Sequence, residues 1–109
     1  MKAILTSKNF ELITRKGVGI ENTPWIGLEV VSKGTAAKHV VEIRLHSDFP
    51  DFNGQPVQYK YRDPYVSHGM RMKNDSLKET LEYIDVLKEA VKFSEKIEKW
   101  MDENPEWKC

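Results

Sequence analysis

The sequence contains one cysteine, Cys109, the last of its 109 residues. With a single thiol the chain has no internal disulfide bond, and a zinc site built from several cysteines is excluded. Small secreted domains usually depend on disulfides for stability, so this shortage favours a reducing compartment. We therefore expect a cytoplasmic protein.

Long apolar runs are also missing. After Met1 and Lys2 the apolar stretch is only three residues, Ala3 to Leu5, before polar residues begin. A secretory signal needs a longer apolar region, and a membrane-spanning helix needs about 20 apolar residues. We expect no membrane segment and interpret the first residues as a short strand.

The chain has no net formal charge, with 17 basic and 17 acidic residues. Proteins that coat nucleic acid by bulk electrostatics usually have a clear basic excess. The balance conceals a division, because residues 1–74 carry eleven basic against seven acidic side chains and residues 75–109 carry six against ten. The two parts would attract each other within one chain, between protomers, or with oppositely charged partners.

No motif for catalysis or metal binding is present. The three histidines, His39, His46 and His68, match no zinc or calcium spacing. Gly17 and Gly19 lack the third glycine and the following helix of a phosphate-binding loop. We expect no enzymatic activity, no catalytic residues, no cofactor and no metal ion.

Residues 1–73 have the alternating pattern of β-strands. Apolar positions alternate in residues 10–20, 26–30, 40–46 and 57–62, with turn residues between these segments. Residues 65–72 form either a further short strand or an ordered loop. Lys33-Gly34-Thr35 has the composition of a hairpin turn.

From Ser76 the apolar period changes to steps of three and four residues, which predicts one helix over 76–103. Ser76 and Glu79 form a capping box at its start, and Asn104-Pro105 ends it. Residues 104–109 form a tail. We predict a single α+β domain over 1–109, an antiparallel meander of four to five strands followed by one long C-terminal helix packed on one face.

The helix has more apolar surface than one contact requires. Leu77, Leu81, Ile84 and Val91 cluster on one side, and a second apolar stripe lies roughly a third of a turn away. Either one broad face covers a twisted sheet, or the second stripe meets another protomer. On the second interpretation the chain forms a homodimer through five helix residues: Tyr83, Val86, Phe93, Ile97 and Trp100.

The stretch YKYRDPYVSHGMRMK, residues 59–73, raises a possible binding function. If the apolar side of the strands faces the helix, the opposite sheet face carries basic side chains beside an aromatic ring, the combination that binds single-stranded nucleic acid. The candidate residues are Arg15, Trp25, Arg44, His46, Lys60, Arg62 and Arg71. In the alternative interpretation, the three glutamates of the same face, Glu11, Glu29 and Glu42, pair with these charges across the strands.

The sequence thus favours a small non-enzymatic interaction or regulatory module that acts through protein contacts and associates with itself. Mobile elements often encode small accessory factors of this type. A single-stranded nucleic-acid binder is the alternative function, and the identity of a protein partner is left open.

Overall fold

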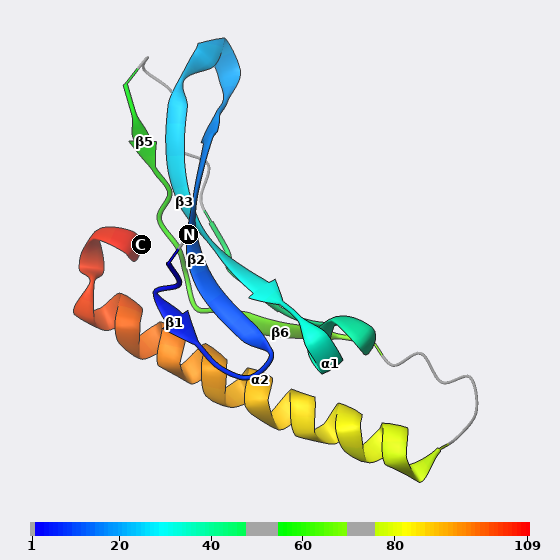
Figure 1. Ribbon diagram of the computed structural model, residues 1–109. Coiled ribbons are helices and arrows are strands. Elements are labelled where there is room, and N and C mark those ends of the chain that lie inside the picture. The colour runs from blue at the N-terminus through cyan, green and yellow to red at the C-terminus, as the bar shows by residue number, and fades with distance from the viewer. Residues whose placement is uncertain (1, 48–54, 70–75) are drawn as a thin grey trace.

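Figure 1 shows the protein as a computed structural model, in which residues 2–47, 55–69 and 76–109 are described. Strands dominate the first part of the chain and one long helix the second. In chain order the elements are β1 (Leu5–Thr6), β2 (Phe10–Val18), the 3-10 turn η1 (Ile20–Asn22), β3 (Pro24–Ser32), α1 (Gly34–Lys38), β4 (Val41–Arg44), β5 (Val57–Gln58), β6 (Tyr65–His68), α2 (Leu77–Glu103) and the 3-10 turn η2 (Pro105–Trp107).

Four of the strands form a curled sheet in the order β1-β2-β3-β5. β1 pairs with β2 and β2 with β3 in antiparallel fashion, whereas β5 joins β3 in parallel. β4 and β6 form a separate antiparallel pair, and β4 lies next to β3. The sheet is therefore mostly antiparallel, with one parallel junction at its edge.

The β2–β3 hairpin is the longest paired unit, and its outer half projects away from α2 (Figure 1). We call residues 17–25, which form this outer half, the arm. Gly17 lies opposite Trp25 in the register, and a Cβ atom at Gly17 would come within 2.4 Å of the Trp25 ring. The glycine lets the indole lie across the neighbouring strand, where any larger residue would displace it.

The core lies between the sheet and α2, which runs across one side of the sheet in Figure 1. Phe10 of β2 and Phe93 of α2 stack with ring centroids 5.9 Å apart. The side chains buried around them are Leu12, Leu28, Ala36, Val41, Ile43, Tyr61, Val86, Ala90, Ile97, Met101 and Trp107. Alternate strand residues and helix residues three and four apart supply this set, as their periods require.

The predicted α+β class, the mostly antiparallel sheet and the long C-terminal helix packed against it are confirmed. Ser76 caps α2 as expected, since its hydroxyl accepts a hydrogen bond from the Glu79 amide at 3.5 Å. The core faces of residues 41–45 and of Tyr61 also agree with the alternation of the sequence.

Two local predictions are wrong. Residues 33–35 begin helix α1 instead of a hairpin turn, because the Thr35 amide donates to Asn9 Oδ1 at 3.2 Å and Ala36 is buried. The expected strand 57–62 is reduced to Val57–Gln58, and it pairs with β3 in parallel. From Tyr61 onward this segment is bonded to other parts of the chain, so the strands do not follow a simple meander order.

Candidate interaction surfaces

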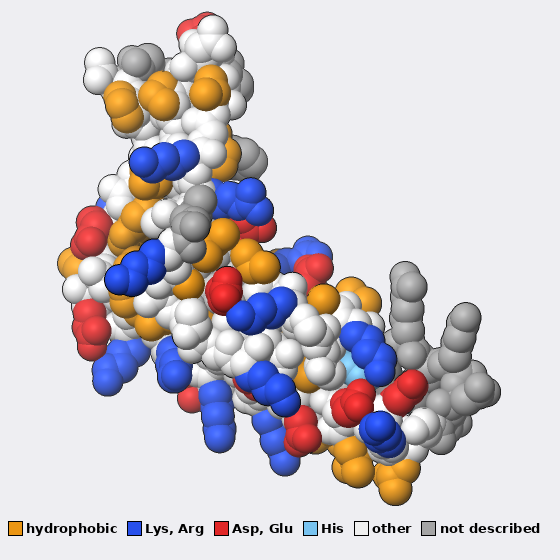
Figure 2. Space-filling model, viewed as in Figure 1, with side chains coloured by type: hydrophobic (Ala, Val, Ile, Leu, Met, Phe, Trp, Pro, Cys, Tyr) orange, Lys and Arg blue, Asp and Glu red, His pale blue; other side chains and the backbone are white. Residues whose placement is uncertain are grey.

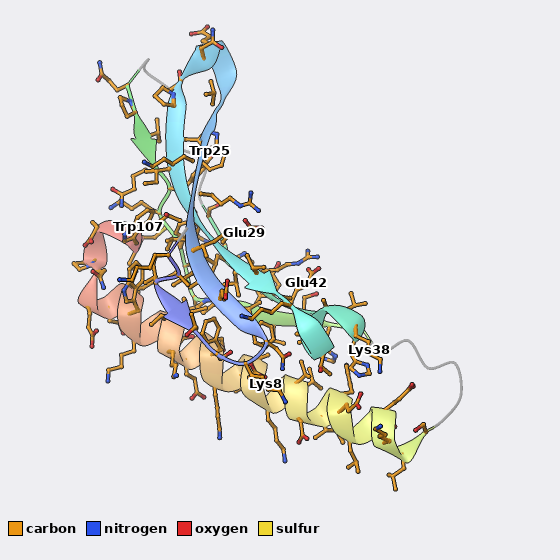
Figure 3. All side chains as sticks on the ribbon, in the orientation of Figure 1. Lys8, Trp25, Glu29, Lys38, Glu42 and Trp107 are labelled. Carbon is orange, nitrogen blue, oxygen red and sulfur yellow. The ribbon has the colours of Figure 1, made fainter. Side chains whose placement is uncertain are left out.

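The basic side chains on the open sheet face are largely paired with acidic ones. Arg15 of β2 forms an ion pair with Glu29 of β3, and Arg44 of β4 lies 3.0 Å from Glu42. Glu29 belongs to β3 and Glu42 to β4, the strand of Arg44 itself, and Figure 3 labels both glutamates. Glu11 pairs with Lys33 at 2.7 Å. All three expected glutamates thus neutralise basic partners, which weakens the case for phosphate binding on this face.

The other residues predicted for this face do not form one cluster. Trp25 packs edge-on against Tyr59, with ring centroids 5.4 Å apart, and it lines a hollow of about 470 Å³ together with Arg15. His46 stacks on Tyr65 at 4.4 Å. Lys60 donates to the Glu106 carbonyl oxygen near the C-terminal end.

Two arginines complete the predicted set. Arg62 is exposed and has interactions with the rest of the chain, and Arg71 lies outside the described residues. Hydrogen bonds from Arg44 to Glu42 and Tyr65 raise the pKa of its guanidinium above its ordinary value, which fits its engagement in local contacts. Nucleic-acid binding on this face stays a prediction.

The helix residues predicted for self-association lie on the side of α2 that faces the sheet. Val86, Phe93 and Ile97 are 2%, 1% and 0% exposed, and they pack against the sheet. Tyr83 and Trp100 are partly buried against the same core. The five residues therefore form the core face, because the sheet covers the stripe that contains the large aromatic side chains and the small Ala90. Self-association itself stays a prediction.

The opposite side of α2 carries the exposed apolar residues. Leu77, Leu81, Ile84 and Val91 are 73%, 52%, 39% and 48% exposed, and their spacing places them along one line. We call these four residues the α2 stripe. Figure 2 shows hydrophobic side chains at the lower right, on the N-terminal end of α2 beyond the sheet. A shallow hollow of about 470 Å³ borders the stripe between Ile84 and Val91.

A clue in the sequence could have separated the two stripes. The core stripe continues without interruption from Tyr83 to Met101, whereas Lys88 and Glu95 interrupt the line of the α2 stripe. A stripe with charged residues at regular positions is less suited to burial in a core. Its apolar residues are therefore the ones left in contact with solvent.

The arm presents a second, smaller apolar surface. Val18 is 65% exposed at its end, and Pro24 and Pro56 are exposed close by. Figure 2 shows hydrophobic side chains at the top of the molecule, over the arm and β5. Trp25, labelled in Figure 3, lines a hollow of about 420 Å³ here together with both prolines.

A group of polar side chains joins α1, β6 and the start of α2. Tyr83 shares a hydrogen bond with Nδ1 of His68, and its ring meets the edge of His39. His39 is 3% exposed, and its Nε2 atom lies 3.6 Å from the Glu82 carboxylate. The charge of Lys38 and its hydrogen bond lower the pKa of Glu82. These contacts tie α1, β6 and α2 together.

Within the described part of the chain, no group of three His, Cys, Asp or Glu side chains could hold a metal ion. None of the helices in the same ranges is long and apolar enough to cross a membrane. The chain matches no protein-family model, and no curated protein or solved structure was found to be similar to it. The candidate function therefore depends on the surfaces themselves.

Proposed function

We propose that the protein is a non-enzymatic interaction module that binds another protein through the α2 stripe. The observation that supports this most directly is the exposure of four large aliphatic residues along one line of a well-formed helix. Monomeric proteins rarely expose contiguous apolar surface of this kind unless it contacts something. A helix face with anchors three and four residues apart suits packing against a partner helix or an apolar groove.

The basic sheet face supports binding less well, because Arg15 and Arg44 already pair with Glu29 and Glu42. Those ion pairs would have to be broken before a phosphate could be bound. The α2 stripe consists of aliphatic side chains, which have no ion pairs to break among the described residues. It is therefore the surface to test first.

The test compares two matched substitutions, Leu81→Lys on the stripe and Val18→Lys on the arm. Both replace an exposed aliphatic residue with lysine, so neither should disturb the core. Tagged wild-type protein and both variants are incubated with a lysate of the cells that naturally make the protein. Captured proteins are identified by mass spectrometry, purified and measured again by calorimetry.

We expect at least one purified partner to bind the wild type and Val18→Lys equally well and Leu81→Lys at least about tenfold more weakly. Loss of binding only in Val18→Lys would place the contact on the arm and contradict the proposal. Equal binding by all three proteins would contradict it as well.

A further inference from the structure

The α2 stripe belongs to a longer regular line of positions. Residues 77, 81, 84, 88, 91 and 95 follow one another at alternating steps of four and three along α2. This is the spacing of the contact line between two helices in a coiled coil. Apolar side chains fill four of the six positions, and Lys88 and Glu95 fill the others. The pattern favours another helix as the occupant.

One flank of this line carries opposite charges one heptad apart. Lys78 follows Leu77 and Asp85 follows Ile84, so both lie on the same side of the line. Both residues are exposed. Among the described residues, Asp85 forms no ion pair with another side chain. Charged residues at flanking positions of this kind set the orientation of paired helices.

Charge decides between parallel and antiparallel pairing of two copies of α2. In a parallel pair each position faces its own copy, so Lys88 would meet Lys88 and Glu95 would meet Glu95. In an antiparallel pair, residues on one flank face the same flank of the other helix. With Leu81 opposite Ile84 of the other copy, Lys78 lies beside Asp85 of that copy, within about 3 Å along the axis at ~1.5 Å per residue.

Because the two helices are related by two-fold symmetry, the attractive pair of Lys78 and Asp85 forms twice. The next antiparallel register places Leu81 opposite Val91, and it brings the two Asp85 side chains together. It also places Lys78 beside Lys92, another repulsive pair. Only the first register combines apolar contacts with complementary flanks.

We propose that the α2 stripe binds a second copy of this chain, with the two helices antiparallel, Leu81 opposite Ile84, and Lys78 beside Asp85 of the other copy. This inference depends on the proposed function, since it names the partner of the same surface. The core face of α2 points away from the line, so the sheets of the two copies lie on opposite outer sides of the helix pair. The first part of α2 extends beyond the sheet (Figure 1).

The dimer is weak and reversible. A stable protein interface buries about 800 Å² on each partner, and a contact limited to three turns of one helix supplies less. We therefore expect a dissociation constant on the order of 100 μM. Reducing agent is needed in every measurement, because the exposed Cys109 could otherwise join two chains by a disulfide.

The test is sedimentation equilibrium over a concentration series, with helix content monitored by circular dichroism. Five samples are compared: wild type, Leu81→Lys, Lys78→Asp, Asp85→Lys, and the double variant Lys78→Asp/Asp85→Lys. An equimolar mixture of the two single charge variants forms a sixth sample. Lys78 and Asp85 are exposed, so the charge variants should fold as the wild type does.

We expect Leu81→Lys and each single charge variant to raise the dissociation constant at least about tenfold, since every change acts twice in a symmetric dimer. The double variant and the mixture should both regain the wild-type constant, because each restores two attractive pairs. A parallel pair would show no such rescue, as positions 78 and 85 would not meet.

A wild type that stays monomeric at 1 mM, about tenfold above the expected constant, would overturn this inference. If Leu81→Lys still abolished binding to a captured partner, the proposed function would nevertheless stand. An unchanged dissociation constant in Leu81→Lys would also overturn the second-copy arrangement. The same holds if the mixture and the double variant do not regain the wild-type constant. Rescue in both the mixture and the double variant would establish it.

Discussion

Glu89 connects the beginning of the chain to the middle of α2. Its carboxylate accepts hydrogen bonds from the Ser7 hydroxyl at 2.6 Å, the Asn9 amide at 2.7 Å and the Asn9 side chain at 2.7 Å. Asn9 in turn accepts a bond from the Thr35 amide of α1. Two residues of the β1–β2 connection and one helix residue thus fix the relative position of three elements.

Stability should depend on pH through Glu89. Burial raises the pKa of this carboxyl, but the hydrogen bonds from Ser7 and Asn9 and the nearby Lys8 outweigh burial and lower it overall. A lowered folded pKa means that the contribution to stability is complete above the unfolded value, about 4.3, and is lost as pH falls through the folded value. The urea concentration at which half of the wild type is unfolded should therefore decrease as the pH is lowered from 5 to 3.

The control is Glu89→Gln, which keeps the size of the side chain and removes its titration. This variant should be less stable than the wild type at pH 6, and the difference should shrink toward pH 3. Urea titrations at both pH values measure it. A difference that stays constant with pH would show that Glu89 does not contribute as a carboxylate.

At this scale the sequence predicted local contacts and missed distant ones. The cap of α2 by Ser76 and the cross-strand pair of Arg15 with Glu29 agree with short spacing and strand alternation. Arg44 instead pairs with Glu42 of its own strand, and Glu11 pairs with Lys33, which was not among the candidate residues. Glu89 and Ser7 are 82 residues apart. No periodicity connects two polar residues at that distance, so their contact appears only in the folded chain.

For helix α2, the sequence predicted the bounds but not the side that faces the sheet. Its existence and bounds follow from apolar periodicity, the Ser76 cap and the stop at Asn104-Pro105. The sequence left open whether both of its apolar stripes or only one meets the sheet, and the stripe considered for self-association is the one that packs there. Periodicity gives the angle between the stripes, but the choice depends on how well aromatic side chains such as Phe93 fill the space beside Phe10.

Paired alanine substitutions test the two faces. Ile97→Ala removes a fully buried side chain and should lower the free energy of unfolding by about 2–5 kcal/mol. Val91→Ala changes an exposed position, and alanine favours helix, so its effect should stay within about 0.5 kcal/mol of zero. Urea unfolding followed by circular dichroism measures both. Equal losses would contradict the observed orientation of α2.

The strands show a similar limit. Alternation predicted strands at residues 10–20, 26–30 and 40–46, where the structure has Phe10–Val18, Pro24–Ser32 and Val41–Arg44, and it assigned the buried side of β4 correctly. Alternation did not show which strands pair with each other, because strand pairing depends on contacts outside the strands. The parallel junction of β5 with β3 and the pairing of β4 with β6 could not be read from local composition.

The C-terminal residues fold back and bind to Tyr61 through hydrogen bonds and a ring contact. The Tyr61 amide donates to the Trp107 carbonyl and the Cys109 amide donates to the Tyr61 carbonyl, both at 2.9 Å. The Trp107 ring stacks on Tyr61 and lies tilted to Trp100, with both centroid distances at 6.4 Å. Figure 3 shows Trp107 beyond the end of α2, where the chain turns back toward the sheet.

Tyr61 also binds β3 through its side chain. Its hydroxyl accepts a hydrogen bond from the Leu28 amide at 2.5 Å, and burial raises the pKa of this hydroxyl, which stays protonated. A Cβ atom at Gly27 would come within 2.6 Å of the same oxygen. One tyrosine therefore connects β3, the segment after β5 and the C-terminal residues.

Removing Trp107 should destabilise the entire domain. Trp107→Ala deletes a buried ring that packs against Tyr61 and should lower the free energy of unfolding by about 3 kcal/mol. Glu106→Ala, at the exposed neighbouring position, is the control and should change it by less than about 0.5 kcal/mol. Thermal and urea unfolding should both show one cooperative transition. A separate early transition in Trp107→Ala would mean that the tail unfolds independently.

The position of α2 after all the described strands determines when the core can form during synthesis. Phe10, Leu12 and Val41 belong to strands that leave the ribosome first, yet the residues that cover them lie between Val86 and Met101. Until that segment emerges, the apolar side of the nascent sheet has no cover. Productive folding must therefore wait until this helical segment has left the ribosome, and the chain before that point is the form that most needs a chaperone.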